Sequence, residues 1–238
     1  HAPEAVPRTY HPDNQPVTVH EQDGGLLVSQ PAEPSTGLSK QMAIRLAEEG
    51  ASVQVVHRLR NEGLWPIEFA PWALSVMAPG GVAVVPLPPR GSHPEDLLPT
   101  SRLILWAYTD MSDPRWGWGR RYTLLRQDAA ASRPQKAGFH CTDGWAAYAR
   151  GGHLFVKRFP YDPAARYPDL GATVETFTDG SMLEVETLGP LARVEPGDSV
   201  EHVETWHLFE GVPPPAGDAD IDAHITPRVE AASWPGAW

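Results

Sequence analysis

Short runs in which apolar and polar residues alternate follow one another along the chain and predict β-strands throughout. The clearest alternation lies at 52–60, and a second clear run lies at 199–210. Asp-Gly at 23–24 and Gly-Gly at 151–152 separate such runs and are typical of hairpin turns. Because no convincing amphipathic helix appears, the pattern predicts an all-β protein of roughly a dozen strands in two packed antiparallel sheets.

Composition supports one large β domain. The chain of 238 residues contains 26 Pro and 21 Gly, which disfavour helices and punctuate strands. Hydrophobic residues make up 41% and include nine Trp, so a sizeable core is available. We expect a single β-sandwich domain at 1–212. The Pro-, Ala- and Asp-rich remainder, 213–238, is expected to be an extended or partly disordered tail.

Net charge and cysteine content limit which binding partners and which cellular compartment we expect. A net charge of −11 repels phosphate backbones, so nucleic acid is a poor candidate partner and none is expected. No apolar run approaches the roughly 20 residues that cross a bilayer, and no membrane partner is expected. The lone cysteine, Cys141, rules out an internal disulfide and is expected to be a buried, inert thiol. This slightly favours the cytoplasm, but the chain begins at His1, so a removed signal segment stays an open alternative.

The stretch 173–194 carries the strongest candidate chemistry. Side chains alternate along a strand, so Glu184 and Glu186 share one face while Leu183 and Val185 point to the other. Two carboxylates roughly 7 Å apart along a strand repel each other unless water, a cation or a ligand separates them. The face is therefore either a wet surface or a polar site, and the sequence leaves both open.

Aromatic and basic residues supply the other candidates. Sugar sites pair aromatic rings with polar groups, and Trp72, Trp116 and Trp118 are candidates for such rings. The last two lie in a Gly-flanked loop and are expected to be exposed. Lys136 begins a strand, where it is either an ordinary surface lysine or a contact for an acidic sugar. His57 lies among apolar residues of its strand and is expected to be a core or half-buried histidine.

Metal and cofactor motifs give no positive signal. His202 and Glu204 share a strand face, but a third firm ligand is missing, so no metal site is predicted. The chain has no nucleophile elbow, phosphate-binding loop or dinucleotide fingerprint, and we expect no cofactor.

The order of several segments resembles the galactose mutarotase-like (aldose 1-epimerase) superfamily, especially a bacterial branch of it. Four segments carry the resemblance and together cover most of the chain: HAPEAVPRTYHPDNQPV, HRLRNEGLWPIEFAPWALSVMAPGG, GFHCTDGWAAYARGGHLFVKRF and YPDLGATVETFTDGSMLEVETLGPLARVEPGDSVEHVETWHLF. The resemblance implies an antiparallel β-supersandwich with a groove for a sugar. It also implies further strands before His1.

The resemblance implies a division of chemical labour as well. In aldose epimerases a histidine protonates the ring oxygen and a glutamate takes the proton of the anomeric hydroxyl. Glu184, with Glu186 as the other candidate, stands on the strand that resembles the one with that base. Trp72 stands where the histidine would fall.

Two functions follow as expectations. The first is a carbohydrate-binding, mutarotase-like protein, acting as an epimerase or isomerase on an unidentified sugar. The alternative is a non-catalytic carbohydrate-binding or structural module of a larger polysaccharide-acting protein. The sequence predicts no oligomeric state.

Overall fold

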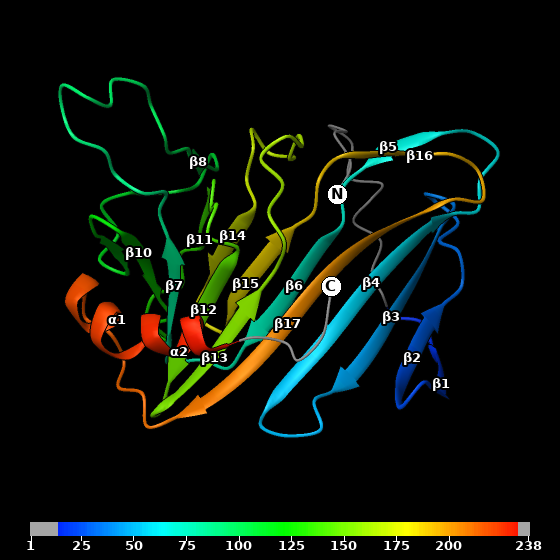
Figure 1. Ribbon diagram of the computed structural model, residues 1–238, viewed down its shortest axis with the longest axis horizontal. Coiled ribbons are helices and arrows are strands. Elements are labelled where there is room, and N and C mark those ends of the chain that lie inside the picture. The colour runs from blue at the N-terminus through cyan, green and yellow to red at the C-terminus, as the bar shows by residue number, and fades with distance from the viewer. Residues whose placement is uncertain (1–13, 233–238) are drawn as a thin grey trace.

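The computed structural model describes residues 14–232, which form an all-β antiparallel sandwich, as the sequence predicts (Figure 1). The strand pairings among these residues are all antiparallel and form a ten-stranded sheet, a five-stranded sheet and a two-stranded ribbon. The ribbon, which pairs β5 with β16, was not expected from the sequence. The strands are β1 (Thr18–Gln22), β2 (Gly25–Gln30), β3 (Leu38–Leu46), β4 (Ser52–Asn61), β5 (Ile67–Phe69), β6 (Trp72–Met77), β7 (Val82–Pro86), β8 (Leu103–Leu105), β9 (Trp116–Trp118), β10 (Tyr122–Arg126), β11 (Gln135–Phe139), β12 (Trp145–Arg150), β13 (His153–Arg158), β14 (Val174–Thr178), β15 (Leu183–Leu188), β16 (Ala192–Val194) and β17 (Ser199–Glu210).

Strand order shows that the two large sheets are built from interleaved parts of the chain. The ten-stranded sheet runs β1-β2-β3-β4-β17-β13-β12-β7-β10-β9, and the five-stranded sheet runs β6-β15-β14-β11-β8. In Figure 1 the long strands β17, β4 and β3 cross the middle of the molecule, with β2 and β1 at one side. Segments that are more than a hundred residues apart therefore pair directly, as β4 does with β17.

Local turn chemistry places the predicted breaks. Asp23 and Gly24 both have positive φ, 51° and 73°, as a two-residue hairpin turn between β1 and β2 requires. Pro71 lies between β5, which ends at Phe69, and β6, which begins at Trp72. A proline has no N–H to give to a sheet, so the chain leaves the small ribbon there and enters the five-stranded sheet.

The main core lies between the ten-stranded and five-stranded sheets. Alternate residues of β15, β14 and β11 turn inward there and meet β7 and β12. Leu183, Val185 and Phe139 are almost completely buried in this layer. The residues between them in sequence must therefore face away from the core, on the outer face of the five-stranded sheet. Cys141 is fully buried in the same core, and burial raises the pKa of its thiol to about 12, as expected for an inert cysteine.

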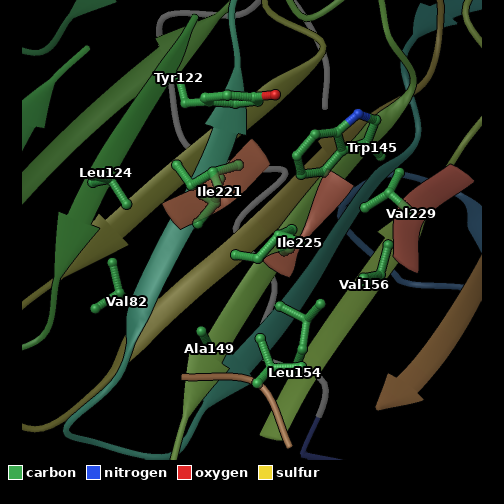
Figure 2. Packing of buried hydrophobic residues seen from close by; sticks show 13 residues of the cluster. Val82, Tyr122, Leu124, Trp145, Ala149, Leu154, Val156, Ile221, Ile225 and Val229 are labelled. Carbon is green, nitrogen blue, oxygen red and sulfur yellow. The ribbon is translucent and has the colours of Figure 1, made fainter. Parts of the chain in front are cut away.

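The C-terminal tail differs from the prediction. Residues 213–238 were expected to be extended or partly disordered, yet two helices, α1 (Asp218–His224) and α2 (Thr226–Ala231), form there. Ile221, Ile225 and Val229 point into an apolar layer on the outer side of β7, β12 and β13, as Figure 2 shows. The sequence does not predict these helices because each one buries a single apolar residue and has no side-chain N-cap. No helix within 14–232 is long and apolar enough to cross a membrane.

Shortening one of these helix side chains tests how much the tail stabilises the sheet. Ile225 has no exposed surface, and Ile225→Ala is expected to lower the free energy of unfolding by about 2–4 kcal/mol, because burial is lost and a cavity remains. Glu230→Ala, an exposed position on α2, is the control and should change it by about 0.5 kcal/mol or less. Urea unfolding followed by fluorescence measures both. Equal effects for the two variants would show that the helices do not stabilise the sandwich.

Candidate functional site

Strand register gathers one lysine and three glutamates on the outer face of the five-stranded sheet. Glu186 on β15 lies directly opposite Glu175 on β14, so the two share a face. Glu184, two residues along β15, lies on the same face, as does Lys136 on β11, which lies opposite Phe177. We call Lys136, Glu175, Glu184 and Glu186 the lysine–carboxylate cluster.

Lys136 is the hub of this cluster. Its Nζ lies 2.7 Å from Glu175 Oε2 and 2.9 Å from Glu186 Oε2, and it also donates to Glu186 Oε1 at 3.1 Å. Only 9% of the Lys136 side chain is exposed, against 1% for Glu175 and none for Glu186. The strand face is therefore a buried polar site around Glu186 rather than a wet surface, and Lys136 is no ordinary surface lysine.

Two indoles enclose the lysine. The Lys136 Nζ lies 5.1 Å from the ring centre of Trp72 and 4.9 Å from that of Trp106, within the range of cation–π attraction. Trp72 Nε1 also donates a hydrogen bond of 2.7 Å to Glu186 Oε2. Trp72, which the sequence offered as a sugar contact, therefore lies in the candidate site and orients one of its carboxylates.

A cavity of about 220 Å³ opens beside the cluster. Lys136, Glu175, Trp72 and Trp106 contribute to its lining, together with the turn at Asp169 and Leu170. Both turn residues have positive φ, 46° and 61°, a conformation that non-glycine residues seldom adopt and that marks functional sites more often than chance. A ligand in this cavity would meet indole faces and carboxyl groups together.

Burial sets the protonation of Glu175. Burial raises the pKa of its carboxyl well above the ordinary range, and the neighbouring Glu186 and Asp169 act in the same direction, although the Lys136 ammonium opposes them. For Lys136 burial alone would lower the pKa, but Glu186 and Glu175 outweigh it, and the pKa lies above its ordinary value. The two pKa shifts favour a charged lysine and a protonated Glu175 near neutral pH.

Glu184 differs from both other glutamates. It is half-buried, and no hydrogen bond or ion pair of its carboxylate is found among the residues that the structure describes. Burial, followed by the nearby Glu186, raises the pKa of Glu184 to about 7. Tyr108 is close enough to feel all four members of the cluster, and burial raises the pKa of its phenol. The cluster thus holds carboxyl groups in different protonation states near pH 7.

Sequence comparison finds no relative of this chain. No protein-family model matches the chain, and no curated protein sequence matches it. Solved structures do match. A candidate aldose 1-epimerase from Klebsiella pneumoniae has a TM-score of 0.54 at 12% identity, over 93% of this chain and 59% of that chain. A candidate mutarotase from Salmonella typhimurium has a TM-score of 0.54 at 10% identity, over 88% and 71%. A galactose mutarotase-like protein from Lactobacillus casei has a TM-score of 0.51 at 12% identity, over 81% and 73%. The chain has the galactose mutarotase-like fold.

The likeness concerns the mutarotase-like fold alone. The chain spans 59% of the length of the Klebsiella protein, less than two thirds. One fold can carry many functions, so a function must be argued from the residues of this chain.

Trp116 and Trp118 do not join the cluster. They stack on each other on β9, with ring centres 4.9 Å apart, at an edge of the ten-stranded sheet. The expected exposed pair is wrong for Trp116, which is 6% exposed in the core and donates from Nε1 to Gln135 Oε1 at 3.1 Å. Trp118 is 39% exposed, and its role as a sugar contact stays a prediction.

His57 belongs to a second polar group, which lies between the sheets. We call Lys157, Glu204, His57, His202 and Thr187 the buried network. Lys157 Nζ lies 2.9 Å from Glu204 Oε1, and both side chains are fully buried. Glu204 Oε2 accepts from His57 Nε2 at 3.2 Å, and Thr187 Oγ1 donates to Glu204 Oε1. His57 is half-buried, as expected, with 18% of its side chain exposed.

The buried network holds its charges in fixed states. Burial alone would raise the pKa of Glu204, but the Lys157 ammonium and the bond from His57 outweigh it and hold the pKa below its ordinary value. Burial lowers the pKa of His202 to about 4, even though Glu204 opposes the shift. His202 is therefore neutral at pH 7, and its Nε2 lies 2.9 Å from Thr187 Oγ1.

The neutral state of His202 predicts a pH dependence of stability. In the unfolded chain the imidazole takes up a proton near its ordinary pKa of 6.5, whereas in the folded chain it does so only near pH 4. Its contribution is complete above pH 6.5 and is lost as the pH falls toward 4, by about 3 kcal/mol in all. Denaturant unfolding of His202→Gln at pH 7 and pH 4.5 should show a smaller loss than the unsubstituted protein. His153→Gln, at an exposed position, should lose as much as the unsubstituted protein; if His202→Gln does too, the assignment is wrong.

Several members of the site were not singled out from the sequence. Glu175 lies between Val174 and Thr176, which are both buried, and this alternation indicates its face but not its partner across the sheet. Trp106, Tyr108 and Asp169 lie in loops, where no strand pairing could place them beside the cluster. Within the described residues no group of three or more His, Cys, Asp or Glu side chains could hold a metal ion.

Proposed function

We propose that this protein binds a sugar at the lysine–carboxylate cluster and interconverts its anomers by acid–base catalysis. Opening a sugar ring needs a base for the proton of the anomeric hydroxyl and an acid for the ring oxygen. The observation that supports the proposal most is the pair of carboxyl groups, Glu184 and Glu175, that share one sheet face and differ in protonation near pH 7. Groups whose environments push their pKa values apart are suited to such paired roles.

Glu184 is the base in this proposal. A pKa of about 7 lies near the working pH, where a general base is most effective. Its side chain is half-buried and lies on the same sheet face as Glu175, which lines the cavity. Glu186, the other candidate from the sequence, is fully buried and accepts bonds from Lys136 and Trp72. It is better suited to hold these two side chains in position than to exchange protons.

Glu175 is the acid. It is protonated at neutral pH and lines the cavity, so it has a proton to donate to the ring oxygen. Lys136 is a poorer donor, because its pKa lies above the ordinary value and both neighbouring carboxyl groups hold its charge. Glu175 thus takes the role of general acid that a histidine has in aldose epimerases. In this chain Trp72 stands at the position of that histidine. After the C1–C2 bond rotates, the two carboxyl groups exchange roles and close the ring.

The indoles supply the binding surface. Trp72 and Trp106 both lie within cation–π distance of Lys136 and line the cavity with it. Sugars present C–H faces that pack on aromatic rings and hydroxyls that bond to carboxyl groups. Lys136 was considered from the sequence as a contact for an acidic sugar, but two carboxyl groups already bind it. We propose an uncharged ring as the substrate group in the cavity.

Polarimetry tests the catalytic part of the proposal. Freshly dissolved α-anomers of a panel of aldoses should equilibrate faster with the protein than in buffer, at a rate proportional to protein concentration. The rate should rise between pH 6 and pH 8 as Glu184 loses its proton. Equilibration at the buffer rate with every aldose would contradict the proposal.

One observation favours a second candidate, a carbohydrate-binding module without catalysis. Trp72 occupies the place of the expected acid and is bound to Glu186, so the site has an aromatic platform where epimerases have a histidine. NMR titration discriminates the two candidates. Saturable binding of an aldose with no faster anomer exchange would favour the module.

A further inference from the structure

A second and larger cavity also has Trp72 in its wall. Its volume is about 330 Å³, and it lies between the edge strand β6 and the strands β2, β3 and β4. Trp72 is the one residue that lines both this cavity and the one beside the lysine–carboxylate cluster, as far as the described residues go. The two cavities therefore meet at a single indole.

The wall of the larger cavity combines apolar and polar groups. Met42, Leu59 and Phe69 contribute apolar surface, and His57 contributes a ring of which 18% of the side chain is exposed. The orientation of the His57 ring is fixed, because Glu204 accepts a hydrogen bond from its Nε2 at 3.2 Å. Polar groups that are fixed in this way, beside apolar surface, are what a sugar ring requires.

An ion pair in the wall of the larger cavity holds two opposite charges together. Glu33 is 4% exposed and forms an ion pair with Lys40, and its Oε2 accepts a bond of 2.8 Å from Thr36 Oγ1. All three residues line the cavity. A paired cation and anion leave this end of the cavity without net charge, so it suits a neutral, hydroxyl-rich group.

Size separates the two cavities. Ligand pockets are commonly about 300–1,000 Å³, and the cavity beside the cluster is smaller, about 220 Å³. It has room for a single sugar ring. The cavity of about 330 Å³ has room for at least one more ring.

We propose that the substrate is an oligosaccharide: its reducing-end ring lies at the lysine–carboxylate cluster, and the next ring lies in the larger cavity, across Trp72. This rests on the proposed function, since the cluster must bind the reducing end. Trp72 packs against the sugar at the junction while its Nε1 keeps its bond to Glu186. The larger cavity then selects for chain length and takes no part in proton transfer.

Isothermal titration of matched sugars tests this inference. Glucose is compared in turn with maltose, cellobiose and lactose, each of which has glucose as its reducing-end ring. We expect at least one disaccharide to bind at least about tenfold more tightly than its reducing-end monosaccharide. A difference of this size is readily measured. Equal affinities within each pair would overturn the inference while leaving the proposed function intact. Absence of binding by every sugar would overturn the proposed function and this inference with it.

Variants locate the second ring. Met42→Trp narrows the larger cavity from β3 and should abolish the gain for the disaccharide without changing monosaccharide affinity. Val28→Phe, on β2, does the same from another wall and serves if the first variant does not fold. Leu46→Phe lies on β3, is 74% exposed outside the cavity and should leave both affinities unchanged. An undiminished disaccharide preference in both folded cavity variants would place the second ring elsewhere and contradict the inference.

Discussion

Replacing Glu175 with glutamine is expected to slow catalysed anomer exchange by about 100-fold or more, the usual cost of losing a general acid. The protonated acid has a proton to give to the ring oxygen, and the amide has none of comparable acidity. Glutamine has nearly the same shape and, like the protonated glutamate, no charge. The fold should therefore survive, with an unfolding midpoint close to that of the unsubstituted protein.

The pH profile separates the acid from the base. Glu184→Gln should also cost about 100-fold or more, and it should remove the rise in rate through pH 7 that ionisation of Glu184 causes. Glu175→Gln should keep that rise on its much lower rate. Glu21→Gln, at an exposed position on β1, is the control and should leave rate and profile unchanged. A full rate in folded Glu175→Gln would assign the acid to another group, with Tyr108 the first to test.

Replacing Lys157 with methionine should be the most destabilising change in the buried network, at about 3–5 kcal/mol. Lys157 is fully buried and pairs with Glu204, so its loss would leave a fully buried carboxyl group without the ammonium that stabilises its charge. The same Nζ reaches the carbonyl oxygens of Ala73 and Val185 at 3.3 and 3.4 Å, so it also ties the two sheets together. Urea unfolding at pH 7 measures the loss.

A double variant tests the cause. Lys157→Met with Glu204→Met removes both charges and should recover much of the loss, because apolar replacement of a whole buried pair is often nearly neutral. Arg58→Met breaks an exposed pair with Glu201 and should cost about 1 kcal/mol or less. If the double variant were less stable than Lys157→Met alone, the loss would come from packing and not from an unpaired charge.

The sequence predicted the strand content and the faces of strands better than their partners. Alternation placed Glu184 and Glu186 on one face opposite Leu183 and Val185, and that is the arrangement in the sheet. Alternation cannot say which strand pairs with which, so the partnership of Glu186 with Glu175 and Lys136 emerges only from register. Most of the chemistry of the site depends on that partnership.

Other differences have physical reasons too. Trp116 was placed in an exposed loop because glycines flank it, but pairing with β10 turns its ring into the core. The tail was expected to be extended because Pro and Asp are frequent in it, yet three buried apolar side chains, with polar contacts such as the bond from Tyr122 to Asp222, hold two short helices on a sheet. In both cases tertiary packing overrode the local signal.

The indole N–H signals of ¹⁵N-labelled tryptophan give the most direct test of the claim that a sugar binds at the lysine–carboxylate cluster. Each signal is assigned by a single Trp→Phe substitution and followed while an aldose is added. Trp72 and Trp106, which both lie close to Lys136, should shift together and saturate with one dissociation constant, while Trp145, buried in the apolar layer beneath the C-terminal helices, stays unchanged. Saturable shifts confined to other tryptophans, or none with any sugar, would contradict the account.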